Sequence, residues 1–565
     1  MLSNTLFAGL SGMNVAQAKL NVVGNNIANA NTVAFKSSRT IIKPQFYVTD
    51  SGGSQPEGDS GGSNPIQRGL GAVVADIERN FQAGAIESTG KGTDLAIDGD
   101  GFFIVQSDER MYTRDGSFKL NANNDLVNSS GQYVQGYGVD RDFNLNATQL
   151  GNLNIPLNAA TITQATTTIR LKGNLSASGA VAAGASILDS QALTTLGGAA
   201  APAAGTTLVS LASAAAPATP LFAVGEVYTL EPQKGGRNLP EQTFTVTAGS
   251  TLQDLMGFYG QSLGINTTVP DDGNPATPAP GITLAASGAT AVQLEIAGNL
   301  GEQNALTLDL DSFRTAAGKT PLAFSKNATS SAVGESVHTP FIAYDTLGTP
   351  VTVNVTTVLE SFSDQGSTWR FFAESPDSQS GSRTVGTGTI SFDTEGQFLD
   401  ATGTALSIDR TGTGAVTPLT FNLNFSAMSG RTSDESAMGM SFQDGLPFGR
   451  LTDFSIGQNG RITGSFSNGA TRTLGQIGLA TFSNRQGLVD RGGNMFVEGA
   501  NSGSAIIGTP GSLSTGKIVS GSLELSNVDI SEEFINLIIA STGFSAASRV
   551  ITTSDQLLTA LLNSR

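Results

Sequence analysis

The N-terminal stretch LSNTLFAGLSGMNVAQAKLNVVGNNIANAN, residues 2–31, decides the fold. Hydrophobic residues recur in it every seven positions, and these are Leu6, Met13, Leu20 and Ile27. The C-terminal segment 529–565 has the same spacing at Leu537, Phe544, Ile551 and Leu558, with Leu561 three residues after the last. A repeat of seven is the pattern by which α-helices pack side by side as a coiled coil. Both ends of the chain therefore predict helices that need helical partners.

The residues between these ends lack the seven-residue repeat and predict β structure. Glycine numbers 69 and proline 20, and charged residues make up only 14%, which is typical of short strands joined by tight turns. A chain of 565 residues is long enough for about three or four domains. We therefore expect a multidomain, mainly β protein, with several β-rich outer domains looped out of an α-helical coiled-coil stem formed by the N- and C-terminal segments.

Local signals place elements along the chain. The first helix should weaken at 24–32, where Gly and Asn favour caps and turns. The segment 36–68 contains Gly, Ser and Pro and predicts an extended arm or hairpin. Asp529, with Glu532 three residues later, has the spacing of a capping box at the start of the last helix. Hairpin turns are expected within 94–105 and at 393–396 and 459–460.

Composition excludes several classes of function. The net charge of -17 argues against a nucleic-acid-binding surface, which needs clustered Lys and Arg. The chain has no Cys and only one histidine, His338, so a zinc enzyme or a His-based triad is nearly excluded and carboxylate chemistry remains. Polar residues interrupt the N-terminal apolar run, and no stretch is expected to be long enough to span a bilayer. We expect no cleavable signal peptide and no membrane insertion.

Three motifs have both a functional and a structural interpretation. The run 98–101, Asp-Gly-Asp-Gly, has alternating carboxylates but lacks the further ligands of a calcium loop, so a turn is favoured. Glu532 and Glu533 are neighbours on a helix and point about a hundred degrees apart, which favours a solvated helix start over paired acid and base. The aromatic residues of 369–372 resemble a sugar-stacking platform, but aromatic residues in a strand are usually core.

The terminal repeats also have two interpretations. They predict either a helical hairpin within one monomer or a polymer in which many terminal helices crowd together. Small residues such as Gly9, Gly12 and Ala540 make narrow surfaces that a single partner would cover thinly, whereas several close neighbours would bury them. This pattern favours the polymer.

The residues of the N-terminal segment also carry a family resemblance. The sequence LSGM at 10–13 and LNVVGNNIANANTVAFK at 20–36 resemble the N-terminal signature of the axial proteins of the bacterial flagellum, the rod and hook subunits. The segments 94–105, 112–118 and 126–136 resemble the β domain beside that signature, and 521–529 with the final helix resembles the family's closing segment. The length and the large inserted region resemble the hook subunits more than the shorter rod subunits.

The resemblance implies a structural protein, without enzyme activity or cofactor, that polymerises with itself into the curved tubular hook. The hook would act as the flexible universal joint that transmits torque from the rod to the filament. The implied partners are the distal rod, the hook cap, the hook–filament junction proteins and the flagellar type III export apparatus. The implied location is extracellular, in the hook of the basal body, after export without a cleavable signal peptide. The residues expected to mediate self-assembly are Leu6, Met13, Leu20, Asn25, Asn26, Ile27, Leu537, Phe544, Ile551, Leu558 and Leu561.

The resemblance and the β signals together predict five parts. These are a terminal helical domain (1–31 and 529–565), a connector (32–70 and 517–528), a discontinuous first β domain (71–157 and 430–516), a second β domain (158–180 and 326–429) and an inserted outer domain (181–325). One departure from the family pattern lies at 540–544, where Gly543 should weaken the last helix by roughly 1 kcal/mol.

Two alternatives to the hook subunit stay open at this stage. The first is a distal rod subunit of the same family, which would form a straight polymer. The second belongs to a different class and is an extracellular carbohydrate-binding or carboxylate-dependent hydrolytic β protein.

Overall fold

The computed structural model describes residues 2–59, 61–268, 279–327, 331–512 and 515–563. The chain divides into two compact units. Unit 1 consists of Met1–Thr161 and Arg450–Arg565, and unit 2 of Ile162–Gly449. Each unit is described below by itself. The protein is mainly β, with long helices at its two ends.

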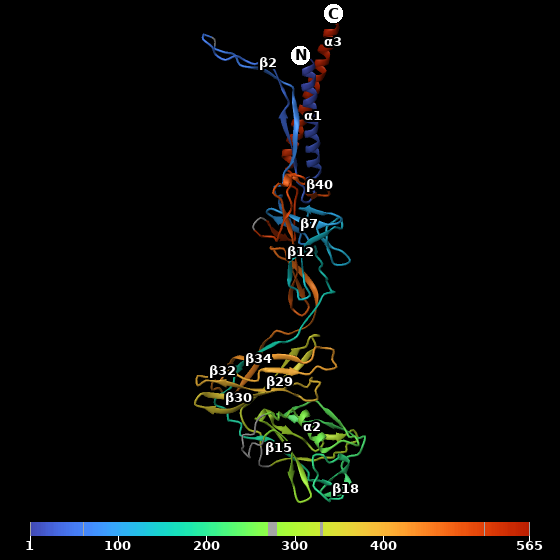
Figure 1. The fold of residues 1–565 in the computed structure, drawn as a ribbon, viewed down its shortest axis with the longest axis vertical. Helices are drawn as coiled ribbons and strands as arrows, with labels where there is room; N and C mark the ends of the chain where they lie inside the picture. Colours follow the sequence, from blue (N-terminus) through green and yellow to red (C-terminus); the bar gives the residue numbers. More distant parts are fainter. Residues whose placement is uncertain (1, 60, 269–278, 328–330, 513–514, 564–565) are drawn as a thin grey trace. The chain divides into compact units, whose positions relative to one another are not determined.

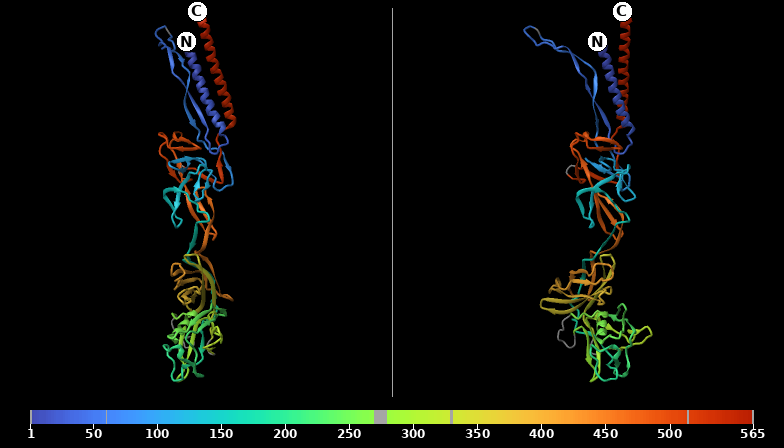
Figure 2. Two further views of the ribbon diagram at one scale, coloured as in Figure 1. Left: turned by 90° about the vertical axis from the view of Figure 1, so that its right-hand side faces the viewer. Right: turned by 45° about the vertical axis from the view of Figure 1, so that its right-hand side comes forward.

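The two terminal helices of unit 1 pack against each other. Helix α1 (Leu2–Ala28) and helix α3 (Ile530–Asn563) lie side by side in all three views (Figures 1 and 2). They run antiparallel, because Thr5 lies beside Ser554 at one end and Asn26 contacts Glu533 at the other. Helix α3 continues unbroken through Gly543, and a Cβ added there would meet no atom within 4 Å. The expected weakening does not interrupt the helix, because tertiary packing and neighbouring turns outweigh one residue's propensity.

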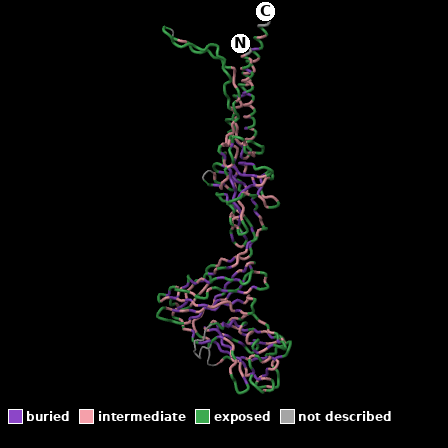
Figure 3. The backbone as a smooth tube through the Cα atoms, in the orientation of Figure 1, coloured by how far each residue is buried: buried purple, intermediate pink, exposed green. Residues whose placement is uncertain are grey.

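A β-hairpin lies against α1 on another side. Its base pairs β1 (Ser38–Pro44) with β4 (Ala72–Arg79), and both strands contact α1. Its outer part pairs β2 (Tyr47–Ser51) with β3 (Ile66–Gly69), and every residue of these two strands is exposed (Figure 3). The structure thus forms the hairpin predicted for this segment, and α1 is packed between α3 and the hairpin base.

The β body of unit 1 is formed by segments from both halves of the chain. Strands β7, β8, β11, β37, β38 and β41 belong to one sheet, and Phe102, Tyr112, Phe482 and Phe496 lie in its core. Two small ladders, β6 with β43 and β5 with β44, join the returning C-terminal segment to this body. The bounds are β5 Ile86–Ser88, β6 Leu95–Asp98, β7 Phe102–Gln106, β8 Arg110–Thr113, β11 Tyr133–Val139, β12 Leu145–Asn152, β36 Leu446–Ile456, β37 Arg461–Phe466, β38 Thr471–Ile477, β39 Leu479–Thr481, β40 Val489–Gly492, β41 Met495–Val497, β42 Ile506–Gly508, β43 Lys517–Ser520 and β44 Ser522–Glu524.

The hairpin predicted within 94–105 is wrong. Strand β6 pairs with β43, whereas β7 pairs with β8, β11 and β39. Gly99 and Gly101 do turn the chain, with φ of 110° and 132°, but the turn directs the two strands into different sheets. Local turn residues specify a reversal of the chain and do not specify the partner of each strand.

Unit 2 contains two large hydrophobic cores among its described residues. In the first, a five-stranded sheet (β28–β32) packs on a four-stranded sheet (order β33-β34-β14-β35). Trp369 and Phe371 are fully buried there, which confirms the core interpretation of these aromatics and leaves no stacking platform. The bounds are β14 Thr168–Asn174, β28 Ser336–Tyr344, β29 Pro350–Ser363, β30 Gly366–Glu374, β31 Thr384–Phe392, β32 Phe398–Ala401, β33 Ala405–Ile408, β34 Leu419–Ser429 and β35 Ala437–Gln443. The predicted turns at 393–396 and 459–460 join β31 to β32 and β36 to β37.

The second core of unit 2 belongs to the inserted segment. A seven-stranded sheet and two three-stranded sheets enclose it together with one helix, α2 (Leu252–Ser262). Thr251 begins this helix with a capping box to Asp254, a local signal that the sequence analysis did not use. The bounds are β15 Ala185–Ser190, β16 Leu193–Thr195, β17 Leu211–Ser213, β18 Ala216–Pro220, β19 Val227–Leu230, β20 Gln233–Lys234, β21 Arg237–Asn238, β22 Gln242–Thr245, β23 Gly281–Ala286, β24 Val292–Leu300, β25 Leu306–Thr307, β26 Phe313–Thr315 and β27 Phe324–Lys326.

Two predicted boundaries differ from the division into units, at 158–161 and at 430–449. The sequence analysis assigned 430–449 to the first β domain, whereas these residues belong to unit 2. The reason is the pairing of β35 with β14, in which Ala437 lies opposite Asn174 and Gln443 opposite Ile169. The five-part division as a whole stays a prediction.

Candidate assembly interface

Most of the residues predicted for self-assembly are half-buried on α1 and α3, the two helices that pack against each other. Leu6, Met13 and Leu20 are half-buried there. Half-buried residues of the facing helix are Leu537, Phe544, Ile551 and Leu558, and Ile27 on α1 is half-buried as well. The side chain of Leu561 lies outside the described residues. One partner helix therefore covers these side chains only in part.

The two helices approach closely because small residues line the contact. A Cβ added at Gly9 would lie 2.9 Å from the side chain of Ile551, and one at Gly12 would lie 3.5 Å from Ala547. Ala16 and Ala540 are buried in the same contact. These are the small residues that the sequence analysis identified as a narrow surface.

Helix α3 also has an apolar face that no element of the described chain covers. Phe534, Ile535, Ile538 and Ile539 are between 51% and 61% exposed, and Leu557 is 57% exposed. Residues 534 and 538, and 535 and 539, are four apart and so lie on one side of the helix. The seven-residue repeat does not include these residues, whereas their spacing of four in the sequence would have predicted the face.

By its length and composition, the segment Ile530–Ala560 of α3 is long and apolar enough to cross a membrane. This corrects the expectation that no stretch is long enough. An apolar helix of this kind is buried either in lipid or by other protein surfaces. Here α3 lies along α1, with Ser554 beside Thr5 and Glu533 bound to Asn26, so one side of it already serves a protein contact.

Asn26 joins three elements of unit 1. Its side chain is fully buried, and its Nδ2 donates to the Ser38 carbonyl and to Glu533 Oε1, both at 2.8 Å, while its Oδ1 accepts from the Ser38 amide at 3.0 Å. Asn25, by contrast, is exposed, and its carbonyl accepts a hydrogen bond from Asn29. The Asn-rich signature therefore contains one side chain that fixes α1 to β1 and to the first turn of α3.

Glu533 differs from the solvated residue that the sequence predicted. It is half-buried and faces Asn26. Burial raises the pKa of its carboxyl above the ordinary value, and the hydrogen bond from Asn26 offsets only part of that effect. The predicted cap at Asp529 is present, because Asp529 Oδ1 accepts from the amides of Ser531 and Glu532 at 2.8 and 3.2 Å.

Glu524 is the centre of a buried ionic cluster that joins both chain ends to the β body. Its carboxylate accepts from Lys36 Nζ at 2.5 Å and from Arg114 Nε at 2.9 Å, and the side chains of all three residues are at most 5% exposed. The amide of Gly84 donates to Oε1 at 2.9 Å, and the Glu524 carbonyl accepts from the Ala34 amide at 2.8 Å. Four segments that are distant in sequence meet at this one residue.

The positive charges of Arg114 and Lys36 offset the cost of burying the Glu524 carboxylate. Burial alone raises the pKa of Glu524, but the charges of Arg114 and Lys36 and the hydrogen bonds to the carboxylate overcome it, so its pKa lies below the ordinary value of 4.5. Burial lowers the pKa of Lys36, and Glu524 offsets part of this. Arg114 also donates to the carbonyls of Gly99 and Gly101 at 2.8 and 2.7 Å. The cluster is therefore fully hydrogen-bonded around its carboxylate, which a buried ion pair requires.

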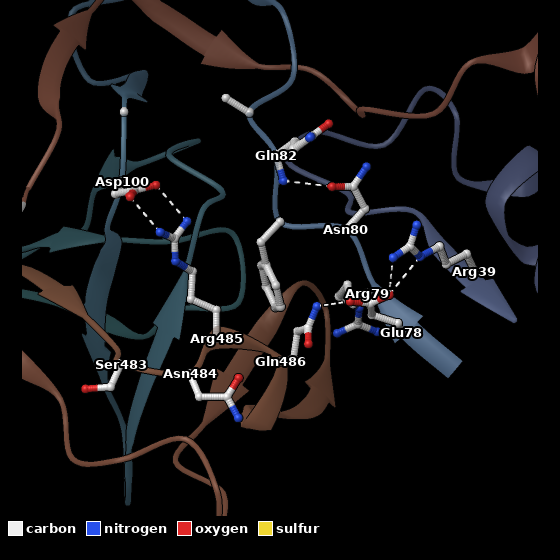
Figure 4. A pocket seen from close by; sticks show the side chains of 13 residues that line it. Arg39, Glu78, Arg79, Asn80, Gln82, Asp100, Ser483, Asn484, Arg485 and Gln486 are labelled. Carbon is white, nitrogen blue, oxygen red and sulfur yellow. Dashed lines mark hydrogen bonds and ion pairs between the residues drawn. The ribbon is translucent and has the colours of Figure 1, made fainter. Parts of the chain in front are cut away.

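A polar pocket of about 680 Å³ lies between the hairpin base and the loop 483–486 (Figure 4). Arg485 closes one side by a two-point ion pair with Asp100, at 2.6 and 2.5 Å. On the other side Glu78 accepts from Arg39 at 2.7 Å and from Gln486. Asp100, part of the run considered for calcium, thus pairs with an arginine. Arg79, which also lines the pocket, forms an ion pair with Asp490 at 2.8 Å. The contacts of Glu78 with Gln486 and of Arg79 with Asp490 join the hairpin to the β body.

Ser11 on α1 and Gly71 beside β4 allow the helix and the hairpin base to lie close together. Ser11 Oγ donates to the Ala8 carbonyl at 2.9 Å and accepts from the Ala72 amide at 3.3 Å. Gly71 has φ of 112°, and a Cβ placed there would lie 2.0 Å from Ser11 Oγ. Only glycine fits this position, on grounds of both space and backbone conformation.

We expect Gly71→Ala to release the hairpin from α1. The combined strain and clash should cost about 1–3 kcal/mol, which hydrogen exchange of 38–79 in the full-length monomer would detect as faster exchange. Gly58→Ala is the matched control, because Gly58 also has positive φ (55°) but open space around its Cβ. Equal protection of the hairpin base in both variants would contradict this account.

Comparisons with known proteins match the segments described above. The model of the flagella basal body rod protein matches residues 6–36, and the C-terminal model of the flagellar basal body rod FlgEFG proteins matches 519–564. The D1 domain model of the flagellar hook protein FlgE/F/G matches 96–177, and the D2 domain model of the flagellar basal body protein FlaE matches 310–446. These models cover both terminal helices and parts of both units.

Relatives that align over the full length distinguish hook proteins from rod proteins, which share some of these family models. The flagellar hook protein FlgE of Treponema pallidum is 28% identical, and the alignment covers 100% of this chain and 99% of the relative. The hook proteins FlgE of Borreliella burgdorferi and Salmonella typhimurium are 29% and 26% identical, with at least 98% of each chain covered. The chain belongs to the flagellar hook protein family. A crystal structure of Helicobacter pylori FlgE2 aligns with 78% of this chain and 100% of its own, at 19% identity and a TM-score of 0.41.

Membership explains the incomplete burial in unit 1. Hook proteins are structural subunits of the flagellum, and a subunit that polymerises has surfaces that only its neighbours complete. In this chain the contact between α1 and α3 is half-buried, and one face of α3 is exposed. The alternatives of a rod subunit and of a carbohydrate-binding or hydrolytic protein are not favoured, because relatives named as hook proteins align over the whole chain.

Proposed function

We propose that this chain polymerises into the curved tubular hook, the flexible universal joint that transmits torque from the rod to the filament, and that α1 and α3 line the inner wall of the tube. The observation that carries the proposal is the exposed apolar face of α3, from Phe534 to Leu557. Burying one such side chain against a neighbour stabilises an assembly by about 1.5–3 kcal/mol. Many subunits packed around a tube bury that face repeatedly.

A bending tube needs contacts that exchange at low cost. Apolar packing between helices is non-directional, so neighbouring inner helices can shift without losing specific partners. Outer surfaces rich in Ser, Thr, Asn and Gly exchange polar and water-mediated contacts. The all-exposed strands β2 and β3 supply a further surface for neighbours, since an isolated two-stranded hairpin is marginally stable.

The family resemblance extends the proposal to partners and location. The subunit would contact the distal rod, the hook cap and the hook–filament junction proteins at the ends of the tube, and it would reach the cell exterior through the flagellar type III export apparatus. A chain without Cys forms no disulfides that could hinder passage in an unfolded state.

The test is a charge placed in the contact between α1 and α3. We expect Leu20→Asp and Leu558→Asp to block polymerisation, because each buries a charge at a cost of several kcal/mol, while circular dichroism still reports folded β units. Asn21→Asp, an exposed position on α1, and Leu558→Met, which keeps an apolar side chain in the contact, are matched controls and should assemble normally. Hooks of normal length from both Leu20→Asp and Leu558→Asp in electron micrographs would refute the proposal.

A further inference from the structure

A cluster of charged side chains lies inside unit 2, where the inserted segment meets the five-stranded sheet. Lys234 on β20 forms an ion pair with Glu374 at the end of β30, and these residues are 2% and 8% exposed. Lys234 Nζ also donates to the carbonyls of Leu263 and Gly264, at 3.3 and 3.2 Å. This pair joins the two cores of unit 2.

Two arginines add positive charge to the same place. Arg383 is 5% exposed, and its Nη2 donates to the Pro240 carbonyl. Arg237 is half-buried and donates from Nη2 to the Gln303 carbonyl at 2.8 Å and from Nε to the Lys234 carbonyl at 3.2 Å. Both arginines therefore bind neutral carbonyls, and in the part of the chain that the structure describes neither forms an ion pair.

Each arginine has one buried N–H group without a hydrogen-bond partner among the described residues. These groups are Nε of Arg383 and Nη1 of Arg237. Buried donors are rarely left unpaired. Burial lowers the pKa of both arginines, and the nearby Glu374 offsets only part of this. One carboxylate thus faces three cations, and water could satisfy the two donors but would leave the excess positive charge.

The segment that carries Arg383 also borders a surface pocket. A surface pocket of about 350 Å³ is lined by Ser382 and Thr384, the two neighbours of Arg383, and by Gln261. The Gln261 carbonyl accepts from the Arg383 amide at 3.4 Å. Arg383 therefore lies between two residues that line this pocket.

We propose that unit 2 binds a small monovalent inorganic anion, of which chloride is the common example, between Arg383 Nε and Arg237 Nη1. The anion accepts hydrogen bonds from these two N–H groups. It also neutralises part of the positive charge of Arg383 and Arg237 that Glu374 does not balance. It binds the turn that follows β20 and the segment before β31 at the same time. The inserted segment is thereby fastened to the five-stranded sheet in a chloride-containing medium.

The experiment compares hydrogen exchange of the full-length monomer in sodium chloride and in sodium gluconate at equal ionic strength. Exchange of 234–240 and 380–384 should be about tenfold slower when chloride is at about ten times its dissociation constant. Arg383→Gln should abolish this difference. Glu374→Gln should enlarge it, because it removes the competing negative charge.

Arg314→Gln is the matched control. Arg314 lies in the same inserted segment but forms an exposed ion pair with Glu231, so this variant should keep the chloride effect. Equal exchange of the wild-type protein in chloride and gluconate would overturn the proposal. Retention of the effect in Arg383→Gln, or its loss in Arg314→Gln, would also overturn it, since either result shows a response unrelated to the cluster.

Discussion

Replacing Glu524 with alanine is expected to unfold the β body of unit 1 while unit 2 stays folded. The substitution leaves Lys36 and Arg114 buried without a counter-charge, since their side chains are 1% and 5% exposed. Breaking a buried ion pair on one side costs about 3–5 kcal/mol. Hydrogen exchange of 95–139 compared with that of 350–374, in the same sample, would measure the loss and provide an internal reference.

A surface ion pair in the same unit is the control for this variant. Glu78→Ala removes the partner of Arg39, whose side chain is 73% exposed, and pairs of this kind contribute little. Glu78→Ala should leave exchange of 95–139 nearly unchanged. If the amides of 95–139 are equally protected from exchange in Glu524→Ala and in Glu78→Ala, the cluster does not hold the β body together.

The same cluster predicts a dependence on pH. Because the pKa of Glu524 is depressed in the folded state, its contribution is fully present above the ordinary pKa of 4.5 and is lost as the pH falls through the lower folded value. Unit 1 should therefore lose stability in acid, and Glu524→Gln should remove that part of the dependence. Denaturant unfolding between pH 3 and pH 6, a range set around that ordinary pKa, would measure both.

Placing a charge on the exposed face of α3 should abolish polymerisation without affecting the monomer. Ile538 is 61% exposed in the subunit, so Ile538→Asp removes no contact within the chain, and its monomer should unfold like the wild type. In an assembled tube the same charge would be buried in every subunit, at a cost of several kcal/mol each. Sedimentation and electron microscopy of the purified variant would detect monomers where the wild type forms tubes.

This variant separates assembly from folding better than the leucine variants do. Ile538→Leu is its control, because it keeps an apolar side chain at the same exposed position on α3, and it should polymerise. Tubes formed by Ile538→Asp at the wild-type concentration would show that another surface drives assembly.

Periodic signals predicted the helices and many of the turns. The seven-residue repeats predicted the two terminal helices, which pack against each other, and the predicted turns at 393–396 and 459–460 join paired strands. These features depend on neighbours within a few residues, and local sequence specifies such contacts directly.

Contacts between distant segments were not predictable in this way. Glu524 meets Lys36 and Arg114 across 488 and 410 positions, and neither spacing leaves a pattern in one sequence. The failed hairpin at 94–105 has the same origin, since β6 pairs with β43 from the far end of the chain. Gly543 shows the converse, because the sequence predicts a weaker helix there but α3 continues through it.

The order in which the two units fold follows from how the chain is divided between them. Unit 2 is continuous, from Ile162 to Gly449, whereas unit 1 needs both ends of the chain. Contacts between distant residues form slowly because loop closure costs entropy before the contact is gained. Once unit 2 has folded, its two ends are held together, and Leu451 can bond to Asn158 and Ala160 at 3.0 Å. Unit 2 should therefore shorten the effective loop of unit 1 and act as its folding template.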